Sequence, residues 1–210
     1  MTDRRAQPHY FSPEPGVASR PVTVRLDLPD LSVALQADRG VFSGTRIDPG
    51  TKLLLLEASA PPADGHVLDL GCGYGPIALT LASRAPGATV WAVDVNDRAL
   101  ALTRANADAA GLTNVRVAAP DDVPGHVRFA AIWSNPPVRV GKAALHDLLD
   151  RWLPRLRPDG RALLVVQKHL GSDSLHRWLQ DQGWLVERRA SRMGYRILEV
   201  APPDDEPVPE

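Results

Sequence analysis

The sequence lacks several features that would by themselves define a class of protein. It holds one cysteine, Cys72, in 210 residues, which excludes an internal disulfide. Its apolar bursts, such as residues 53–56, are far too short to span a bilayer, and no signal-peptide pattern is present. The formal net charge is −1, so binding to nucleic acid would need a local basic patch. We therefore expect a cytoplasmic chain of ordinary one-domain size, with no membrane partner.

Motifs for metal and serine chemistry are missing as well. None of the six histidines shows the spacing of metal ligands, and with a single cysteine we expect no metal site. No Gly-x-Ser-x-Gly nucleophile motif and no internal repeat occur. The function must therefore be sought in a different kind of motif.

Residues 66–76 are typical of a buried strand, a glycine-rich turn and the start of a helix. Gly71, Gly73 and Gly75 remove Cβ atoms where the backbone turns and approaches a ligand, and Pro76 fits the first helical position. Such a turn directs backbone N–H groups and a helix N-terminus at whatever lies above the strand. An ordinary strand-to-helix turn is the alternative interpretation.

Two acids decide which ligand suits the turn. A dinucleotide fingerprint would place its third glycine at position 76, where this chain has proline, and Asp69 would repel a pyrophosphate. These features disfavour a nicotinamide dehydrogenase and favour a cationic ligand. Asp94 ends the next apolar strand, 19 residues after Gly75, close to the spacing of an acid that accepts hydrogen bonds from ribose hydroxyls.

The turn Asp69-x-Gly71-x-Gly73-x-Gly75 resembles motif I of the class I S-adenosylmethionine-dependent methyltransferases. The resemblance implies S-adenosylmethionine as cofactor. The residues expected to bind it are Asp69, Gly71, Cys72, Gly73, Gly75, Asp94, Val95, Asp121 and Asn135. Asp121 is the favoured partner of the adenine amino group, although Asp121 and Asp122 are equally read as turn residues. Cys72 is interpreted mainly as a packing residue, with a reactive thiol as the alternative.

A second motif, Asn135-Pro136-Pro137, follows another apolar strand. Ligands of open parallel sheets bind at the carboxyl ends of strands, so this motif should face the same cleft as the glycine turn. Two prolines fix the backbone and leave carbonyl groups without local partners. The Asn135 side-chain oxygen and the Pro136 carbonyl could then both accept from one NH₂ group, which predicts Asn135, Pro136 and Pro137 as catalytic. A rigid turn after a strand is the alternative.

An Asn-Pro-Pro loop suits methyl transfer to a planar amine. Two acceptors on the amine hydrogens localise its lone pair and aim it at an already activated methyl group, so positioning can replace a strong general base. The nitrogen gains positive charge as it reacts, and the two oxygens bind it more tightly then.

The second motif also resembles a narrower family. Asn135-Pro136-Pro137, followed by Arg139-x-Gly141-Lys142, looks like motif IV of the RsmC-like guanine-N2 methyltransferases of ribosomal RNA. Gly40-Val41-Phe42-Ser43 and Asp48-x-Gly50-Thr51 resemble the same family, over roughly residues 20–200. The resemblance implies methylation of the exocyclic N2 of a guanine in ribosomal RNA, with the small subunit favoured.

Four residues are expected to bind the substrate: Phe42, Val138, Arg139 and Lys142. Val138 stands where many relatives have an aromatic residue that stacks on the target base, and Phe42 is the candidate substitute, with burial in the core as its alternative. Arg139 and Lys142 flank the loop and could hold phosphates, while Lys142 is equally read as a first-turn helix residue. Arg188, Arg189, Arg192, Arg196 and Lys168 form either a solvated face or a basic patch.

Other functions stay open at this point. Asn-Pro-Pro loops also occur in enzymes that methylate adenine N6 or the glutamine side chain of proteins, although the missing aromatic residue weakens the adenine reading. A non-catalytic S-adenosylmethionine-binding ribosome assembly factor is a further alternative. The sequence does not decide between a monomer and a dimer.

The strand and helix patterns predict an α/β fold. Val22 to Ala37 alternate as a β-hairpin through Pro29-Asp30, which should lie over the cofactor face or extend it, and Asp48-Pro49 begins a helix to about residue 60. Strands are expected at 66–70, 88–94, 114–118, 127–134, 160–167, 184–190 and 195–201, and helices at 76–85, 96–110, 142–156 and 172–183. This alternation indicates a doubly wound, mostly parallel seven-stranded sheet, and the family resemblance implies a closing antiparallel strand.

The chain is expected to divide into three parts. Residues 1–20 form a flexible arm, residues 21–201 the methyltransferase domain, and residues 202–210 a disordered acidic tail. Within the domain, residues 21–60 form the hairpin and helix and residues 66–201 the Rossmann-like core.

Overall fold

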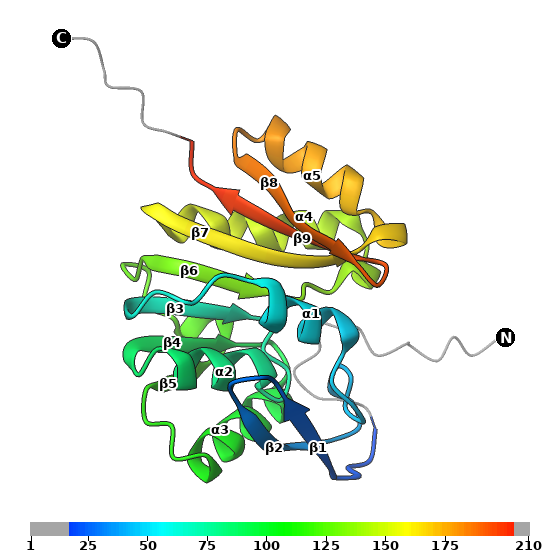
Figure 1. Ribbon diagram of the computed structural model, residues 1–210, viewed down its shortest axis with the longest axis vertical. Helices are drawn as coiled ribbons and strands as arrows, with labels where there is room; N and C mark the ends of the chain where they lie inside the picture. Colours follow the sequence, from blue (N-terminus) through cyan, green and yellow to red (C-terminus); the bar gives the residue numbers. More distant parts are fainter. Residues whose placement is uncertain (1–16, 204–210) are drawn as a thin grey trace, which may run out of the picture.

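The computed structural model describes residues 17–203, except for the side chain of Arg139. Its centre is a seven-stranded sheet in the order β5-β4-β3-β6-β7-β9-β8 (Figure 1). Its strands are β3 (Asp64–Leu70), β4 (Gly87–Val93), β5 (Val115–Ala118), β6 (Phe129–Ser134), β7 (Leu156–Gln167), β8 (Leu185–Arg192) and β9 (Tyr195–Ala201). The first five run parallel, and β9 pairs antiparallel with both β7 and β8. The expected doubly wound, mostly parallel sheet is confirmed.

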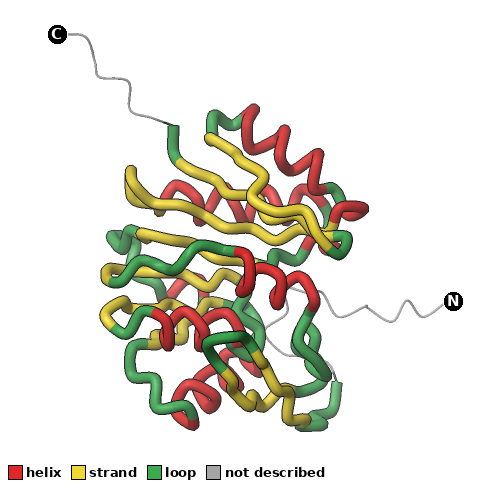
Figure 2. Tube along the Cα trace, viewed as in Figure 1, coloured by secondary structure: helices red, strands yellow, loops and turns green. Residues whose placement is uncertain are grey.

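Helices cover both faces of this sheet (Figure 2). They are α1 (Pro49–Glu57), α2 (Pro76–Arg84), α3 (Asp97–Ala109), α4 (Lys142–Trp152) and α5 (Ser172–Asp181). The buried side chains form two clusters, one beneath α1, α2 and α3 and the other beneath α4 and α5. Neighbouring residues of β3 point to opposite faces, so Val67 lies in the first cluster and Leu68 in the second. The parallel strands therefore carry apolar residues on both faces, which accounts for their continuous apolar runs.

The predicted helix 142–156 is too long by one turn. Helix α4 ends at Trp152, a 3-10 turn spans Leu153–Arg155, and β7 begins at Leu156 instead of residue 160. Pro154 lacks the N–H that another helical turn would need. Leu153 and Leu156 are nevertheless buried, so the apolar spacing continued beyond the end of the helix and misled the prediction.

The hairpin of β1 (Val22–Asp27) and β2 (Ser32–Ala37) forms as predicted but does not extend the main sheet. It makes a separate two-stranded sheet that packs its buried Leu26 and Leu35 into the first cluster, beside α3. Asp30 at its tip pairs with Arg84 at the end of α2. The hairpin thus lies against the helices, and only the loop after it reaches the cofactor face.

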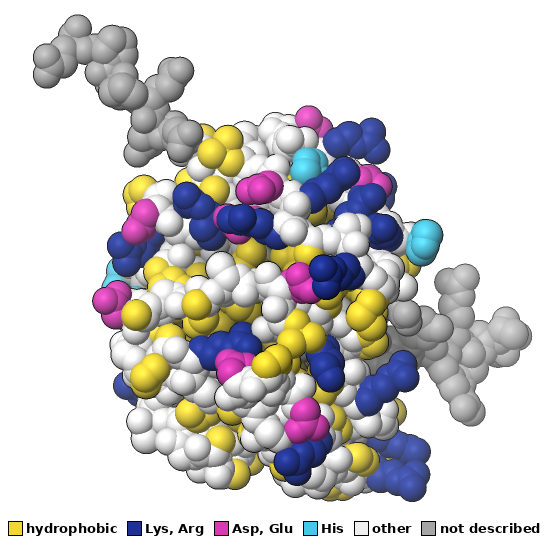
Figure 3. Space-filling model, in the orientation of Figure 1, with side chains coloured by type: hydrophobic (Ala, Val, Ile, Leu, Met, Phe, Trp, Pro, Cys, Tyr) yellow, Lys and Arg dark blue, Asp and Glu magenta, His cyan; other side chains and the backbone are white. Residues whose placement is uncertain are grey.

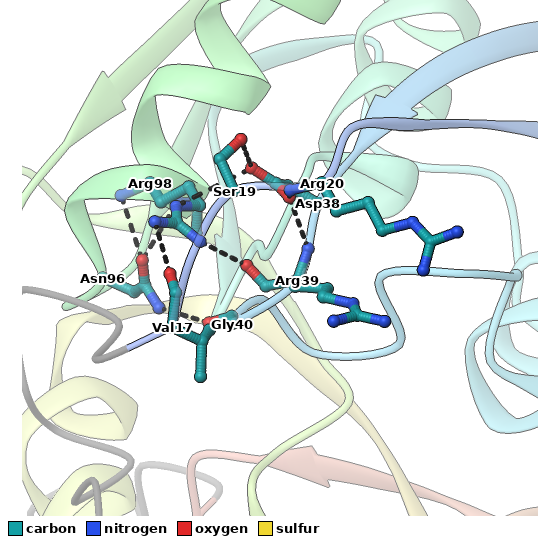
Figure 4. Close-up of polar contacts among 9 residues, drawn as sticks. Val17, Ser19, Arg20, Asp38, Arg39, Gly40, Asn96 and Arg98 are labelled. Carbon is teal, nitrogen blue, oxygen red and sulfur yellow. Dashed lines mark hydrogen bonds and ion pairs between the residues drawn. The ribbon is translucent and has the colours of Figure 1, made fainter.

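The segment before the hairpin is tied to α3 (Figure 4). The buried carboxylate of Asp38 accepts from the Ser19 hydroxyl and the Arg20 backbone N–H. Arg98 donates to the backbone carbonyls of Val17 and Arg39. Residues 17–20 of the expected flexible arm are therefore held in place, while residues 1–16 and the acidic tail from 204 lie outside the described part of the chain.

Candidate functional site

The glycine turn joins β3 to α2 with three residues of positive φ. Gly71, Gly73 and Gly75 have φ of 78°, 57° and 95°. A Cβ on Gly75 would lie 2.8 Å from the Leu79 side chain, so packing as well as φ requires glycine there. A Cβ on Gly71 would meet nothing within 4 Å, because that face of the turn is open to a ligand.

Asp94 follows β4 beside this turn. Its carboxylate accepts the Gly73 backbone N–H at 2.9 Å and the Asn96 backbone N–H at 3.0 Å. Burial raises the pKa of Asp94, while these N–H groups favour its charged form. The side chain lines a pocket with Val95, which also follows β4. Both residues therefore lie where the sequence predicted cofactor contacts.

Asp69, which was expected to bind the cofactor, lies behind the glycine turn. The side chain is fully buried, and one carboxylate oxygen accepts the Ala78 backbone N–H at 2.8 Å, in the first turn of α2. Burial raises the pKa of Asp69 to about 8, and nearby Asp94 adds to the shift. Asp69 lines neither of the two pockets at this edge of the sheet, so it supports the glycine turn from behind.

Asn135 follows β6, and its amide is held from α1. The amide nitrogen donates to the Asp48 carboxylate at 2.8 Å and to the Thr51 hydroxyl at 3.0 Å. Asp48 is the N-cap of α1 and accepts the backbone N–H groups of Gly50 and Thr51 through the same oxygen. Within the described chain no donor bonds the Asn135 side-chain oxygen. Sequence reasoning identified the cap and the family motif around Asp48, but not their contact with Asn135.

The prolines after Asn135 differ from the expectation in one respect. The Pro136 carbonyl accepts the Val138 backbone N–H at 2.8 Å, so it does not lack a local partner. The prediction was wrong because Pro137, with φ of −74° and ψ of 72°, turns the chain so tightly that the Val138 N–H reaches the Pro136 carbonyl. A carbonyl oxygen has two lone pairs, and one stays available to a ligand.

Two pockets meet at Gly71, where the strand ends come together. The first is lined by the glycine turn, Asn135, Asp48 and Phe42. The second is lined by Asp94, Val95, Pro120, Pro137 and Trp152. The glycine turn and the Asn-Pro-Pro loop thus face a common region.

The four predicted substrate residues lie in different environments. Phe42 is 49% exposed and lines the pocket, which contradicts burial in the core. Val138 is half-buried and packs against the second apolar cluster. Lys142 is exposed at the start of α4. Arg139 lies in the 3-10 turn, and its side chain is outside the described part of the structure.

Asp121 does not reach either pocket. Its side chain is 92% exposed and pairs with Arg151 at 2.7 Å. The 3-10 turn at Pro120–Asp122 places Pro120 at the second pocket and directs Asp121 outward. The Asp121 side chain therefore points away from both pockets, which argues against its predicted contact with an adenine amino group.

Cys72 is buried within the glycine turn. Its sulfur lies 3.7 Å from the Thr103 hydroxyl, and burial raises the pKa of the thiol well above its usual value. A reactive thiol needs a lowered pKa, so the environment favours the packing role.

The arginines of the closing hairpin are neutralised by ion pairs. Arg188 and Arg196 pair with Asp173, Arg189 pairs with Glu199, and Arg192 pairs with Glu57. The solvated-face interpretation therefore fits these residues better than a basic patch.

Two other kinds of feature are absent from the described residues. No group of three or more His, Cys, Asp or Glu side chains among them could hold a metal ion. Likewise, no helix between residues 17 and 203 combines the length and apolar character needed to cross a membrane.

Comparison with known proteins identifies the family. The profile of the methyltransferase small domain matches residues 32–199, most of the chain. The chain belongs to this methyltransferase family. It is therefore a methyltransferase of the class I, RsmC-like type, and its cofactor is S-adenosylmethionine.

Relatives and solved structures agree with this assignment. The uncharacterized protein YbxB of Bacillus subtilis is 36% identical over 195 residues, which cover 91% of this chain and 97% of YbxB. Ribosomal RNA small subunit methyltransferase C of Pseudomonas aeruginosa is 35% identical over 173 residues, covering 75% of this chain and 52% of the relative. This chain thus spans about half the length of that methyltransferase.

The solved structure of the Thermus thermophilus 16S ribosomal RNA N2 G1207 methyltransferase RsmC, in complex with AdoMet and guanosine, is also similar. It matches with a TM-score of 0.71 and 25% identity, over 88% of this chain and 50% of that one.

Proposed function

We propose that this methyltransferase methylates the exocyclic N2 of a guanine in ribosomal RNA, with the small subunit as the favoured particle and the cytoplasm as the location. The observation that carries the proposal is the fixed amide of Asn135, which lines the pocket beside the glycine turn. Relatives named as small-subunit ribosomal RNA methyltransferases support the guanine and the RNA.

The contacts of Asn135 determine which of its atoms faces a substrate. The Asn135 amide nitrogen donates one hydrogen bond to Asp48 and one to Thr51. The Asp48 carboxylate can accept hydrogen bonds but cannot donate them. A flipped amide would set the Asn135 oxygen against this carboxylate, so the orientation is fixed electrostatically. The oxygen is left as an acceptor for an amine hydrogen.

Asn135 and Pro136 would act by orienting the amine of the substrate. S-adenosylmethionine supplies an activated methyl group on a sulfonium when bound. The Asn135 oxygen and the second lone pair of the Pro136 carbonyl would accept the two hydrogens of a guanine NH₂ group and aim its lone pair. Because the nitrogen becomes positive during transfer, both oxygens would bind it more strongly in the transition state.

The proposal extends to the residues that hold the cofactor. Asp94 would accept from the ribose hydroxyls, and the apolar side chains of the second pocket, including Val95, Pro120 and Trp152, would hold the adenine. Gly71 and Gly73 would let the amino-acid end of the cofactor approach the backbone, while Gly75 allows the turn to pack on Leu79. Phe42, exposed at the rim of the first pocket, would stack on the target base in place of Val138.

Other possible substrates are different molecules that carry the same kind of nucleophile. Adenine N6 and the glutamine amide also present an NH₂ on an sp² carbon, so the Asn135 oxygen suits them too. A non-catalytic assembly factor would have no use for an asparagine held by two acceptors beside the cofactor turn.

Removal of the Asn135 amide tests its catalytic role. Asn135→Ala should lower turnover about 10²–10³-fold while S-adenosylmethionine affinity persists, by analogy with loss of one transition-state hydrogen bond. Thr51→Val, which removes only one acceptor of the Asn135 nitrogen, should lower turnover less and leave cofactor affinity unchanged. Thr80→Val is the matched control, since the buried Thr80 hydroxyl bonds only the Pro76 carbonyl. Normal turnover in Asn135→Ala would remove this residue from the mechanism.

The identity of the target requires a transfer assay. Tritiated methyl groups should enter small ribosomal subunits incubated with the wild-type protein, and nucleoside analysis should recover N2-methylguanosine. Label in N6-methyladenosine or in protein would contradict the guanine proposal. Asn135→Ala provides the background.

A further inference from the structure

The loops beside Asn135 at the carboxyl edge of the sheet carry a strong excess of positive charge. Residues 39–47 contain Arg39 and Arg46, residues 135–142 contain Arg139 and Lys142, and residues 168–171 contain Lys168. None of these three loops contains an Asp or Glu, although the whole chain has a net charge of −1. The positive charge is therefore local to this edge.

The loops on the β4 and β5 side of the same edge have the opposite character. Asp94 and Asp97 follow β4, and Asp121 and Asp122 follow β5. The carboxyl edge is therefore polarised, with acids near the pocket assigned to ribose and adenine and, apart from Asp48, which accepts from Asn135, bases on the other side. The cofactor has no phosphate, so it does not account for the basic side.

The basic side chains on this edge are available to such a ligand. Arg39, Arg46, Lys142 and Lys168 are all exposed. Within the described part of the chain none of the four forms an ion pair with a carboxylate, whereas each arginine of the closing hairpin does. Figure 4 shows the Arg39 guanidinium extending away from the polar cluster around Asp38. Dark blue side chains lie along the right-hand side of the molecule in Figure 3, the side toward which the arrows of β3 and β6 point in Figure 1.

The backbone that carries the two arginines is already fixed. The Arg39 carbonyl accepts from Arg98, and the Gly40 carbonyl accepts from Asn96 at 2.9 Å. The Arg46 carbonyl accepts the Tyr74 hydroxyl at 3.1 Å, which ties it to the glycine turn. Binding would therefore order side chains only, and the entropy cost of ordering the loop is avoided.

We propose that Arg39, Arg46, Lys142 and Lys168, together called the basic rim, bind phosphates of the RNA that flanks the target base. This inference rests on the proposed function and extends it, because it states where the substrate backbone lies. Phe42 lies between Arg39 and Arg46 in sequence and lines the first pocket, so the same loop would contact both base and backbone. A polyanion fits several exposed bases around one pocket, whereas a neutral glutamine side chain does not require them.

The test measures how RNA binding depends on salt. A fluorescently labelled single-stranded oligoribonucleotide is titrated with Arg39→Ala/Arg46→Ala at several salt concentrations. Each lost phosphate contact should make the plot of log K against log salt less steep by about 0.7. Arg39→Lys/Arg46→Lys should restore most of the slope, because a phosphate contact of this kind needs charge. S-adenosylmethionine affinity should stay unchanged in both variants.

The matched control is Arg128→Ala/Arg157→Ala. Both residues lie at the opposite, amino edge of the sheet: Arg128 is exposed, precedes β6 and bonds backbone carbonyls, and Arg157 is half-buried at the start of β7 and pairs with Asp159. This variant loses the same charge and should keep the wild-type slope. Equal losses in both double variants would mean a diffuse field and would overturn the basic rim, as would an unchanged slope in Arg39→Ala/Arg46→Ala.

The outcomes separate this inference from the proposed function. RNA methylation by a protein whose salt slope does not depend on Arg39 and Arg46 would refute the basic rim alone. RNA binding that requires the basic rim, with methyl groups transferred to a protein instead, would refute the proposed function and leave the basic rim in place.

Discussion

At the scale of single residues, Asp69 combines complete burial with an incomplete set of hydrogen bonds. One of its carboxylate oxygens accepts from Ala78, while the other has no partner among the described residues. Removing a carboxylate from water disfavours its charged form, and Asp94 adds repulsion. Since burial raises its pKa to about 8, Asp69 is largely protonated at neutral pH in the folded protein.

This shift predicts a pH dependence of stability. The folded protein keeps the Asp69 proton up to about pH 8, whereas the unfolded chain releases it near about pH 4. Between these values the folded state binds more protons, so the free energy of unfolding should decrease as pH rises, by about 1.4 kcal/mol per pH unit at most. Asp69→Asn should flatten this decrease. Urea unfolding at a series of pH values measures it, and equal slopes in both proteins would contradict the assigned pKa.

At the scale of elements, one side chain joins the hairpin to the catalytic half of the molecule. Asn106 of α3 accepts the Gln36 backbone N–H at 2.7 Å and donates to the Gln36 carbonyl at 2.9 Å, as a neighbouring strand would. It also donates to the Tyr74 carbonyl at 2.8 Å, inside the glycine turn. Asn106 is buried, so its loss leaves polar groups of β2 and the turn without partners.

Asn106→Ala should therefore destabilise the protein strongly. Each buried group left unpaired costs about 1–3 kcal/mol, and the hairpin should exchange its amide hydrogens faster than the main sheet does. Urea unfolding and hydrogen exchange measure the two effects. Gln36→Ala is the control, because Asn106 bonds the Gln36 backbone and that variant should keep both properties nearly unchanged. A variant Asn106→Ala with wild-type stability would show that the apolar contacts of Leu26 and Leu35 alone hold the hairpin.

At the scale of the whole molecule, the cofactor site connects parts that are far apart in sequence. The two pockets take residues from the loop after the hairpin, from the turns after β3 and β4, and from the loop after β6. A ligand that binds only this assembled arrangement stabilises the folded state by mass action, by about 2.7 kcal/mol at a hundred times its Kd.

S-adenosylmethionine should consequently raise the melting temperature, and NAD should not. Asp94→Ala should weaken cofactor binding about ten- to a hundredfold, through loss of hydrogen bonds to a charged acceptor worth about 1.5–3 kcal/mol, and reduce the thermal shift accordingly. Asp121→Ala serves as the control, since the structure turns that exposed acid toward Arg151. If Asp121→Ala lost affinity and Asp94→Ala did not, the ribose and adenine assignments would both be wrong.

The candidate site divides into residues that local patterns could predict and residues that they could not. The glycines, Asp94 and Asn135 follow apolar strands, and parallel strands bring their carboxyl ends to one edge, so their convergence was predictable. The outward direction of the Asp121 side chain was not predictable, because a 3-10 turn changes the direction of successive side chains and the adjacent proline left its register open. The Asp48 contact with Asn135 joins residues 87 positions apart, which no local pattern contains.

By itself the sequence determined the order of strands and helices, the glycine turn, the family and its cofactor, because these depend on periodicity and short motifs within one segment. Only the tertiary structure decided that Asp69 supports the turn from behind and that the hairpin packs on α3. It also decided that the arginines of the closing hairpin are paired while those beside Phe42 have no ion pair within residues 17–203. Side-chain direction, burial and ion pairing depend on which distant segments meet, and that is settled only when the whole chain is packed.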